Sequence, residues 1–155
     1  MFANSVREYL DQRHAKYVTI SHQPAYTAQE VAAAAHISGR MMAKTVMVKI
    51  DGEMAMVVLP ADRRVDLEYL KKITRAQTVR LASEEEFKGM FPGCEVGAMP
   101  PLGALYGLEV YAARELTEDD EIAFNAGTFT EVVKLPYAEF RRLARPRVCD
   151  ITARD

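Results

Sequence analysis

The chain has 155 residues, of which 49% are hydrophobic and 27% charged, and its formal net charge is −2 at pH 7. This length and composition predict one soluble globular domain spanning residues 1–155 and argue against a second domain. The slightly negative balance excludes an overall basic field, so any contact with nucleic acid is expected to be local.

The number of cysteines and the N-terminal sequence predict the cellular compartment of the protein. The two cysteines, Cys94 and Cys149, lie far apart and outside any CxxC spacing, which argues against a disulfide framework and a thiolate metal site. The N-terminal segment is charged throughout and lacks the apolar core of a signal peptide, and no apolar run reaches the length of a membrane span. We therefore expect a cytoplasmic protein that makes no membrane contact.

The first half of the chain is predicted to mix helices and strands. Apolar spacing predicts helices at residues 5–15 and 27–36, with a strand at residues 17–21 between them. Two apolar runs, residues 43–50 and 53–59, then flank Asp51-Gly52, which predicts a β-hairpin. Because both runs are apolar on two faces, the hairpin is expected in the middle of a helix-covered sheet.

The second half continues the same mixture. The predicted elements, in order, are a helix at 66–73, a strand at 78–81, a helix opening at residue 83, strands at 108–113, 121–126 and 131–135, and a helix at 137–143. The tail, residues 144–155, is expected to be poorly ordered. This arrangement predicts an α+β fold with a mixed, largely antiparallel sheet.

One charged residue interrupts the apolar pattern of the first hairpin strand. Strict alternation places Lys44 on the same face as Val46, Val48 and Ile50. Burying an ammonium group is costly unless it finds partners or opens onto water. Lys44 therefore either extends to solvent from the strand end or lines a functional site.

Two glycine-containing loops carry a similar ambiguity. Residues 97–103, with the sequence GAMPPLG, combine two glycines with two prolines, which fixes the backbone direction. Residues 125–130, with the sequence NAGTFT, interrupt two β-type runs with small and hydrogen-bonding residues. Each loop is either a plain turn or one wall of a pocket that presents backbone N–H groups.

Basic residues cluster late in the chain, but the standard catalytic motifs are absent. Such clusters either decorate a solvated helix face or touch a few phosphates, and the late arginines are Arg141, Arg142, Arg145 and Arg147. The sequence holds no phosphate-binding loop, dinucleotide fingerprint, nucleophile elbow or HExxH helix, and the three histidines have no metal-pair spacing. We expect neither a metal nor another cofactor.

Taken in order, several stretches resemble the YbaK/ProRS-associated (EbsC-like) editing-domain family. This family comprises free-standing aminoacyl-tRNA deacylases and the insertion domain of bacterial prolyl-tRNA synthetases. The matching stretches are ISHQPAYTAQEVA at 20–32, AKTVMVK at 43–49, GAMPPLG at 97–103 and FNAGTFTEVVKLPYAEF at 124–140. No single motif is diagnostic, but the ordered set covers almost the whole chain.

The resemblance implies a mixed, barrel-like β-sheet flanked by helices and a trans-editing activity. Members hydrolyse the ester that links a wrongly attached amino acid to the terminal adenosine of tRNA. For this chain the resemblance implies a tRNA of the tRNA-Pro type that carries a small amino acid. They use few or no side-chain acids and bases and rely on positioning, oxyanion stabilisation and a ribose hydroxyl of the substrate. The implied partners are the acceptor end of aminoacyl-tRNA and, as a further candidate, an aminoacyl-tRNA synthetase.

The resemblance also assigns roles to individual residues. Lys44 is implied as the catalytic residue that holds and neutralises the polar end of the substrate. Backbone N–H groups of the 97–103 loop face the ester carbonyl, and Tyr26 is a lid or stacks on the terminal adenine. The implied substrate-binding residues are Tyr26, Thr45, Gly97, Pro100, Pro101, Gly103, Asn125, Gly127, Thr128 and Phe129.

One departure from the family pattern affects specificity. Many relatives carry a histidine where this chain has Phe129. A phenylalanine there predicts a smaller, more apolar pocket and a small amino acid as the substrate side chain. The alternatives are a catalytically idle module that binds tRNA or a nucleotide, and an unrelated small-molecule hydrolase of the same fold.

Overall fold

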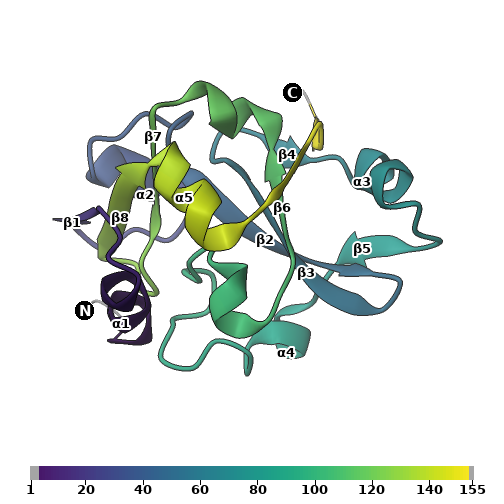
Figure 1. Ribbon diagram of the computed structural model, residues 1–155, viewed down its shortest axis with the longest axis horizontal. Coiled ribbons are helices and arrows are strands. Elements are labelled where there is room, and N and C mark those ends of the chain that lie inside the picture. Colours follow the sequence, from purple (N-terminus) through teal and green to yellow (C-terminus); the bar gives the residue numbers. More distant parts are fainter. Residues whose placement is uncertain (1–3, 154–155) are drawn as a thin grey trace.

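The computed structural model describes residues 4–153 (Figure 1). Its helices are α1 (Asn4–Gln12), α2 (Ala28–Ala34), α3 (Leu67–Thr74), α4 (Glu84–Phe87) and α5 (Tyr137–Ala144), with 3₁₀-helices η1 (Gly103–Tyr106) and η2 (Arg114–Glu118). Its strands are β1 (Val18–Ser21), β2 (Ala43–Ile50), β3 (Glu53–Pro60), β4 (Arg64–Val65), β5 (Val79–Leu81), β6 (Val110–Ala113), β7 (Glu121–Asn125), β8 (Glu131–Pro136), β9 (Arg147–Cys149) and β10 (Thr152–Ala153).

The strands form two main sheets and one small pair. The larger sheet has the order β5-β2-β3-β6-β9, the smaller has the order β1-β8-β7, and β10 pairs with β4. Pairing is antiparallel except where β6 runs parallel to both β3 and β9. The two sheets meet at a parallel bridge between Met42 and Ala123. The predicted α+β fold with a mixed, largely antiparallel sheet is therefore confirmed.

The predicted hairpin lies in the middle of the larger sheet. Asp51 and Gly52 connect β2 to β3 with φ angles of 49° and 83°, the left-handed pair that a tight hairpin turn requires. The Asp51 carboxylate also accepts hydrogen bonds from the backbone N–H groups of Gln77 and Thr78, each at 2.9 Å. These bonds fix the start of β5 beside β2.

Side-chain alternation along β7 separates two layers of packing. Ile122 and Phe124 point into the main core, which also contains Phe140 of α5. Ala123, between them, points to the other face and packs with Val31 of α2. Helices α5 and α2 therefore cover opposite faces of the smaller sheet.

The C-terminal segment corrects one expectation. A poorly ordered tail was expected from residue 144, but β9 pairs in parallel with β6 and β10 pairs with β4. Ile151 between them is fully buried in a cluster with Leu70 of α3. The expectation is wrong for residues 144–153 because these long-range contacts order a segment whose local sequence carries a weak strand signal.

No helix among residues 4–153 is long and apolar enough to cross a membrane.

Candidate active site

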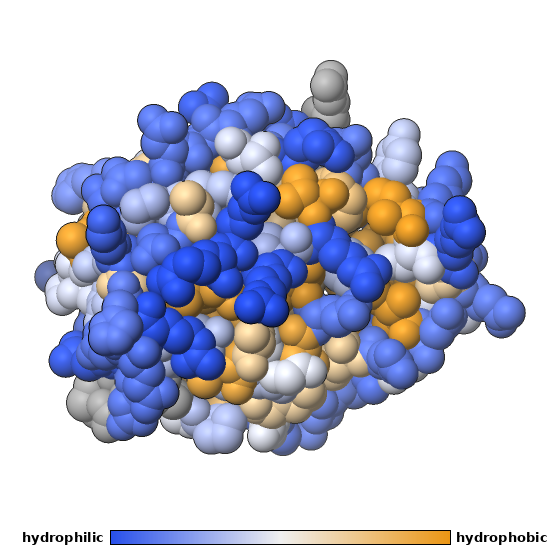
Figure 2. All heavy atoms as spheres, viewed as in Figure 1, coloured by the Kyte–Doolittle hydropathy of each residue, from blue (hydrophilic) through white to orange (hydrophobic). Residues whose placement is uncertain are grey.

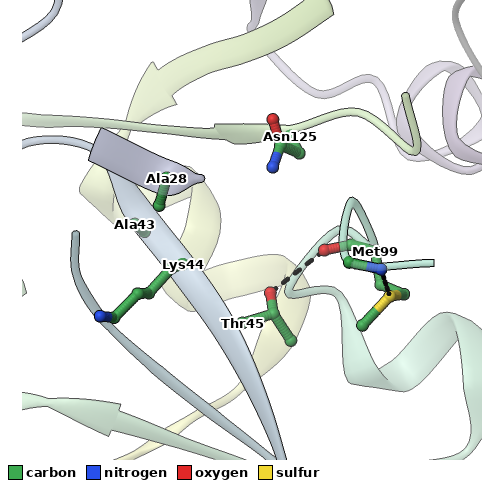
Figure 3. A pocket seen from close by; sticks show the side chains of 7 residues that line it. Ala28, Ala43, Lys44, Thr45, Met99 and Asn125 are labelled. Atoms are coloured by element: carbon green, nitrogen blue, oxygen red, sulfur yellow. Dashed lines mark hydrogen bonds between the residues drawn. The ribbon is translucent and has the colours of Figure 1, made fainter. Parts of the chain in front are cut away.

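A pocket of about 170 Å³ lies where β2 begins, β7 ends and α2 starts (Figure 3). A loop from the segment between α4 and η1 completes it. The residues that line it are Ala28, Ala43, Lys44, Thr45, Gly97, Met99 and Asn125. Four of them, Lys44, Thr45, Gly97 and Asn125, are residues that the sequence assigned to the site.

Helix α2 reaches the pocket through a well-defined start. Thr27 is its N-cap, and its side-chain oxygen accepts a hydrogen bond from the Glu30 N–H at 3.1 Å. The Glu30 carboxylate accepts in return from the Thr27 N–H, also at 3.1 Å. This reciprocal capping box fixes the first turn and places the small Ala28 side chain against the pocket.

Lys44 and Thr45 are neighbours on β2 whose side chains point to opposite sides of the strand (Figure 3). The Thr45 hydroxyl donates a hydrogen bond to the Met99 carbonyl at 3.1 Å. This bond joins the beginning of β2 to the loop that forms the other wall. Thr45 therefore has a structural contact as well as a place in the lining.

The Lys44 ammonium lies at the end of the hairpin. It donates to the Ala61 carbonyl at 3.4 Å, and the same oxygen accepts from the Gln29 side chain at 3.3 Å. Figure 3 shows the ammonium directed away from Thr45 and Met99. Because lysine carries its charge on a flexible four-carbon stem, the group can turn from this weak carbonyl contact to a bound anion.

The loop wall presents one backbone donor with a weak partner. Gly97 adopts φ +94°, which glycine tolerates without strain, and its N–H donates to the Met99 sulfur at 3.0 Å. A thioether is a poor acceptor compared with a carbonyl or an oxyanion. The Gly97 N–H is therefore a suitable donor to a substrate oxygen that replaces the sulfur.

Asn125 closes the pocket from the end of β7. Its Oδ1 is buried and accepts no hydrogen bond from any residue in the described range 4–153. An unpaired buried amide oxygen costs about 1–3 kcal/mol. Figure 3 shows the amide across the pocket from Thr45, where a polar substrate group would satisfy it.

The two glycine loops are held together by backbone bonds and one carboxylate. The Gly127 N–H donates to the Ala98 carbonyl at 2.9 Å, and the Glu95 N–H donates to the Gly127 carbonyl at 2.8 Å. The Glu95 carboxylate also accepts from the Phe129 N–H at 2.7 Å. Gly127 thus joins the two loops without lining the pocket itself.

An aromatic pair stands beside the loop wall. The Phe129 ring packs on Gly97, where an added Cβ would lie 3.2 Å from its Cζ atom. Tyr26, with 69% of its surface exposed, also contacts the Phe129 ring, with ring centroids 5.2 Å apart and the rings tilted by 59°. Tyr26 and Phe129 are outside the pocket lining and form its flank.

The remaining assigned residues lie away from the lining. Pro100 and Pro101 are buried, and Thr128 is buried with its hydroxyl 3.4 Å from that of Thr130. Gly103 begins η1, where an added Cβ would lie 2.5 Å from the Leu108 carbonyl oxygen. The structure therefore gives these four residues packing contacts and does not bring them into the pocket.

Sequence reasoning missed four residues of this region. Ala28, Ala43 and Met99 line the pocket, and Glu95 holds the loops together. Two alanines, one methionine and a single exposed glutamate form no local sequence pattern that marks a site. Only the capping box at Thr27-Glu30 gave a signal for the position of Ala28.

Of the seven lining residues, Lys44 is the only one with a titratable side chain. Cys94, three residues before Gly97 in the chain, contacts the Tyr106 hydroxyl at 3.4 Å, and burial raises the pKa of its thiol. A thiol with a raised pKa is a poor nucleophile. Within residues 4–153, no group of three or more His, Cys, Asp and Glu side chains is arranged to hold a metal ion.

Replacing Glu95 by alanine is expected to loosen the 125–130 loop. The Phe129 N–H loses a charge-assisted hydrogen bond worth about 1.5 kcal/mol, so its amide should exchange with solvent roughly tenfold faster. Amide hydrogen exchange measured by NMR checks this. Glu95→Gln retains an acceptor and should restore most of the protection, and Glu53→Ala at the exposed hairpin end is the matched control. Equal exchange in Glu95→Ala and the wild type would rule out this role.

Comparison with known proteins agrees with this fold. The family model described as "Aminoacyl-tRNA editing domain" matches residues 22–143. The chain belongs to this family, whose members are hydrolases that act on aminoacyl-tRNA, and the resemblance inferred from the ordered motifs is confirmed.

Individual relatives include free-standing and synthetase proteins. The multifunctional Ser/Thr-tRNA deacylase ProXp-y of Escherichia coli strain K12 is 30% identical over 144 residues, which cover 90% of this chain and 86% of that protein. The proline–tRNA ligase of Bacillus mycoides strain KBAB4 is 32% identical over 84 residues, which cover 54% of this chain and 15% of the ligase.

Solved structures share the fold over nearly the full chain. Hypothetical protein APE2540 superposes with a TM-score of 0.86 at 23% identity, covering 97% of this chain and 100% of that one. A structure described as a candidate trans-editing enzyme for prolyl tRNA synthetase superposes with a TM-score of 0.82 at 23% identity, covering 99% and 100%. At these identities the likeness establishes the fold.

Proposed function

We propose that this protein is a single-domain trans-editing hydrolase that deacylates mischarged tRNA carrying a small amino acid, with tRNA-Pro as the expected type. The observation that supports it most is the convergence of Lys44, Thr45, Gly97 and Asn125 on one pocket in a chain of the editing family. ProXp-y, a Ser/Thr-tRNA deacylase, is similar over most of both chains. The substrate would enter by its acceptor end. Because the proposed substrate is a tRNA used in translation, we propose that the protein acts in the cytoplasm.

The proposed reaction is ester hydrolysis driven by positioning. Water adds its hydroxyl to the acyl carbon, the bond to the ribose oxygen breaks, and that oxygen takes the second proton of the water. The neighbouring ribose hydroxyl of the terminal adenosine orients the water and relays the proton. Because an aminoacyl ester is already activated, orientation and oxyanion stabilisation supply most of the acceleration.

Some pocket residues are proposed to bind the substrate, and others to stabilise the charge that develops during hydrolysis. The Gly97 N–H exchanges its sulfur partner for the developing oxyanion, a contact of the kind worth roughly 10²–10³-fold in rate. Lys44 turns from the Ala61 carbonyl to neutralise the phosphate and ribose side of the substrate. Asn125 and Thr45 contact the aminoacyl group.

The flanking aromatic pair is proposed to hold the terminal adenine and limit side-chain size. Tyr26 is exposed and supported by Phe129, so it offers a face on which a base can stack. Phe129 in turn holds Gly97 in place. Since size exclusion yields only about 1–3 kcal/mol per methylene, neighbouring small amino acids should be cross-accepted.

A panel of mischarged tRNA-Pro carrying alanine, cysteine, serine or threonine, together with correctly charged Pro-tRNA, tests this function. We expect hydrolysis of the small side chains within a roughly 10-fold to 200-fold range of one another. Tight tRNA binding with no hydrolysis of any ester would instead support the catalytically idle module. Equal hydrolysis of simple aminoacyl esters and of aminoacyl-tRNA would support the small-molecule hydrolase.

A synthetase is the further candidate partner. Related sequence occurs inside a proline–tRNA ligase, where it occupies 15% of the chain. A free-standing protein would receive its substrate after release from such an enzyme. Adding the synthetase to the deacylation assay and comparing rates tests whether it assists delivery.

A further inference from the structure

A second hollow, of about 290 Å³, lies between α1, α5 and η1, and three arginines line it. Its lining residues are Tyr9, Arg13, Ala104, Arg142, Leu143 and Arg145. It shares no residue with the pocket at Lys44. Figure 2 shows the deepest blue, the colour of the most hydrophilic residues, running across the face that α5 occupies in Figure 1. We call this hollow the arginine groove.

Hydrogen bonds and one stacked guanidinium form the base of the groove. Tyr9 of α1 is buried, and its hydroxyl donates to the Leu143 carbonyl of α5 at 3.3 Å. The Arg13 guanidinium lies over the Tyr9 ring, 3.8 Å from its centroid. The Arg142 side chain donates to the Arg13 carbonyl at 3.1 Å. These contacts hold the charged groups from two distant parts of the chain around one hollow.

The positive charge of the groove is only partly compensated. Arg142 forms a two-point ion pair with Glu139, at 2.9 and 3.1 Å, and this pair holds the pKa of Glu139 at about 2. Arg13 and Arg145 form no ion pair with any described residue from 4 to 153. Three guanidinium groups thus face one carboxylate in a chain whose formal net charge is −2.

Helix electrostatics explains only part of this cluster. Arg141 and Arg142 lie in the last turn of α5, where the helix dipole favours positive charge. Arg13 directly follows the last residue of α1, so the dipole of that helix favours its charge in the same way, but neither dipole supplies an anion for three neighbouring guanidinium groups. Its guanidinium is stacked, which leaves the N–H edge available for a planar anion, the geometry in which arginine binds phosphate.

The chain connects the groove closely to the candidate active site. Gly97 lines the pocket and Ala104 lines the groove, and they are seven residues apart. Because an extended chain spans at most about 3.6 Å per residue, their Cα atoms lie within about 25 Å. The two sites are therefore close enough for one tRNA molecule to contact both.

We propose that the arginine groove is a second binding site that takes backbone phosphates of the tRNA whose aminoacylated end enters the pocket. The inference rests on the proposed function for its ligand, since a nucleic acid is the polyanion that would reach both sites. It adds a contact away from the ester, one that is independent of base sequence and of the attached amino acid. The local charge also explains how a chain with negative net charge attracts a polyanion.

The test compares binding of uncharged tRNA by the wild type and by Arg13→Gln/Arg145→Gln as salt is raised from about 50 to 200 mM. Each lost phosphate contact should reduce the slope of log K against log salt by about 1, so the slope should be shallower by about 2. At the lowest salt the affinity should fall roughly tenfold. Lys71→Gln/Lys72→Gln on α3 changes the net charge equally and should leave the slope unchanged. An unchanged slope in the arginine variant overturns the proposal.

A second experiment distinguishes tRNA phosphates from free phosphate as the ligand of the arginine groove. It also distinguishes failure of this proposal from failure of the proposed function. Titration with inorganic phosphate should show no saturable binding that depends on Arg13 and Arg145. Saturable binding of that kind, with tRNA binding unaffected, would assign the groove to a free phosphate ligand and overturn the proposal. Because the readout is tRNA affinity, a changed slope in a protein that hydrolyses no ester would sustain the groove while the proposed function fails. Ester hydrolysis together with an unchanged salt slope in the arginine variant would support the proposed function and overturn the proposal for the groove.

Discussion

Lys44→Ala is expected to reduce kcat/KM for deacylation of mischarged tRNA by roughly 10²-fold, or about 2.7 kcal/mol of transition-state stabilisation. The ammonium is the only titratable group in the lining and the only one that can neutralise a substrate anion there. Single-turnover kinetics on tRNA carrying alanine measures the effect. Because the side chain is half-buried at a strand end and outside the main core, the unfolding free energy should change by no more than about 1 kcal/mol.

Lys49→Ala is the matched control for this prediction. Lys49 lies on the same strand, points to the opposite face and donates to the Gly52 carbonyl at 3.3 Å. Its loss should leave deacylation within about twofold of the wild type, which is the scale of a surface substitution. Lys44→Arg keeps the charge but changes its shape, so we expect partial activity. Equal deacylation rates for Lys44→Ala and Lys49→Ala would show that Lys44 has no role in the reaction.

Gly103→Ala is expected to have the largest effect on stability. An added Cβ would lie 2.5 Å from both the Leu108 carbonyl oxygen and Val110 Cγ2, and the backbone oxygen belongs to a turn that Leu108 N–H closes onto Gly103 at 2.9 Å. Forcing such a contact into a packed site costs about 3 kcal/mol. Thermal unfolding should show a midpoint roughly 6–12 °C lower.

Gly89→Ala provides the comparison for Gly103→Ala. A Cβ at Gly89 meets no atom within 4 Å, and its backbone does not need a positive φ. This substitution should leave the midpoint unchanged or raise it slightly, because alanine restricts the unfolded chain more than glycine does. If both variants unfold at the same temperature, the close approach at Gly103 does not constrain the fold.

Local sequence signals predicted the parts of the fold that local chemistry determines. Asp51-Gly52 specified the hairpin because few other pairs accept two left-handed residues, and alternation placed Lys44 opposite Thr45. The parallel pairing of β6 with β3 and β9 could not be predicted, because it joins segments whose order in the sheet depends on distant packing. The same reason explains the ordered tail around Ile151.

For the candidate site too, some features could be predicted from the sequence and others depend on tertiary structure. Lys44 was conspicuous as a charge on an apolar face, and the two glycine loops were conspicuous in composition. Tertiary structure brings Gly97 and Asn125 to β2 and packs Gly103, the first residue of η1, against Leu108. A local motif does not encode these contacts. Glu95 acts through a single bond to Phe129, and Arg13 joins Arg142 and Arg145 only because α1 packs on α5.

The rate at which the wild-type protein hydrolyses tRNA-Pro carrying alanine or serine, measured against the rate in buffer, tests the central claim most directly. A positioned oxyanion donor alone is expected to raise the rate by roughly 10²–10³-fold, so the two time courses should separate clearly. The pocket of Lys44, Thr45, Gly97 and Asn125 would then be an editing site. Hydrolysis no faster than in buffer for every small amino acid would contradict the claim.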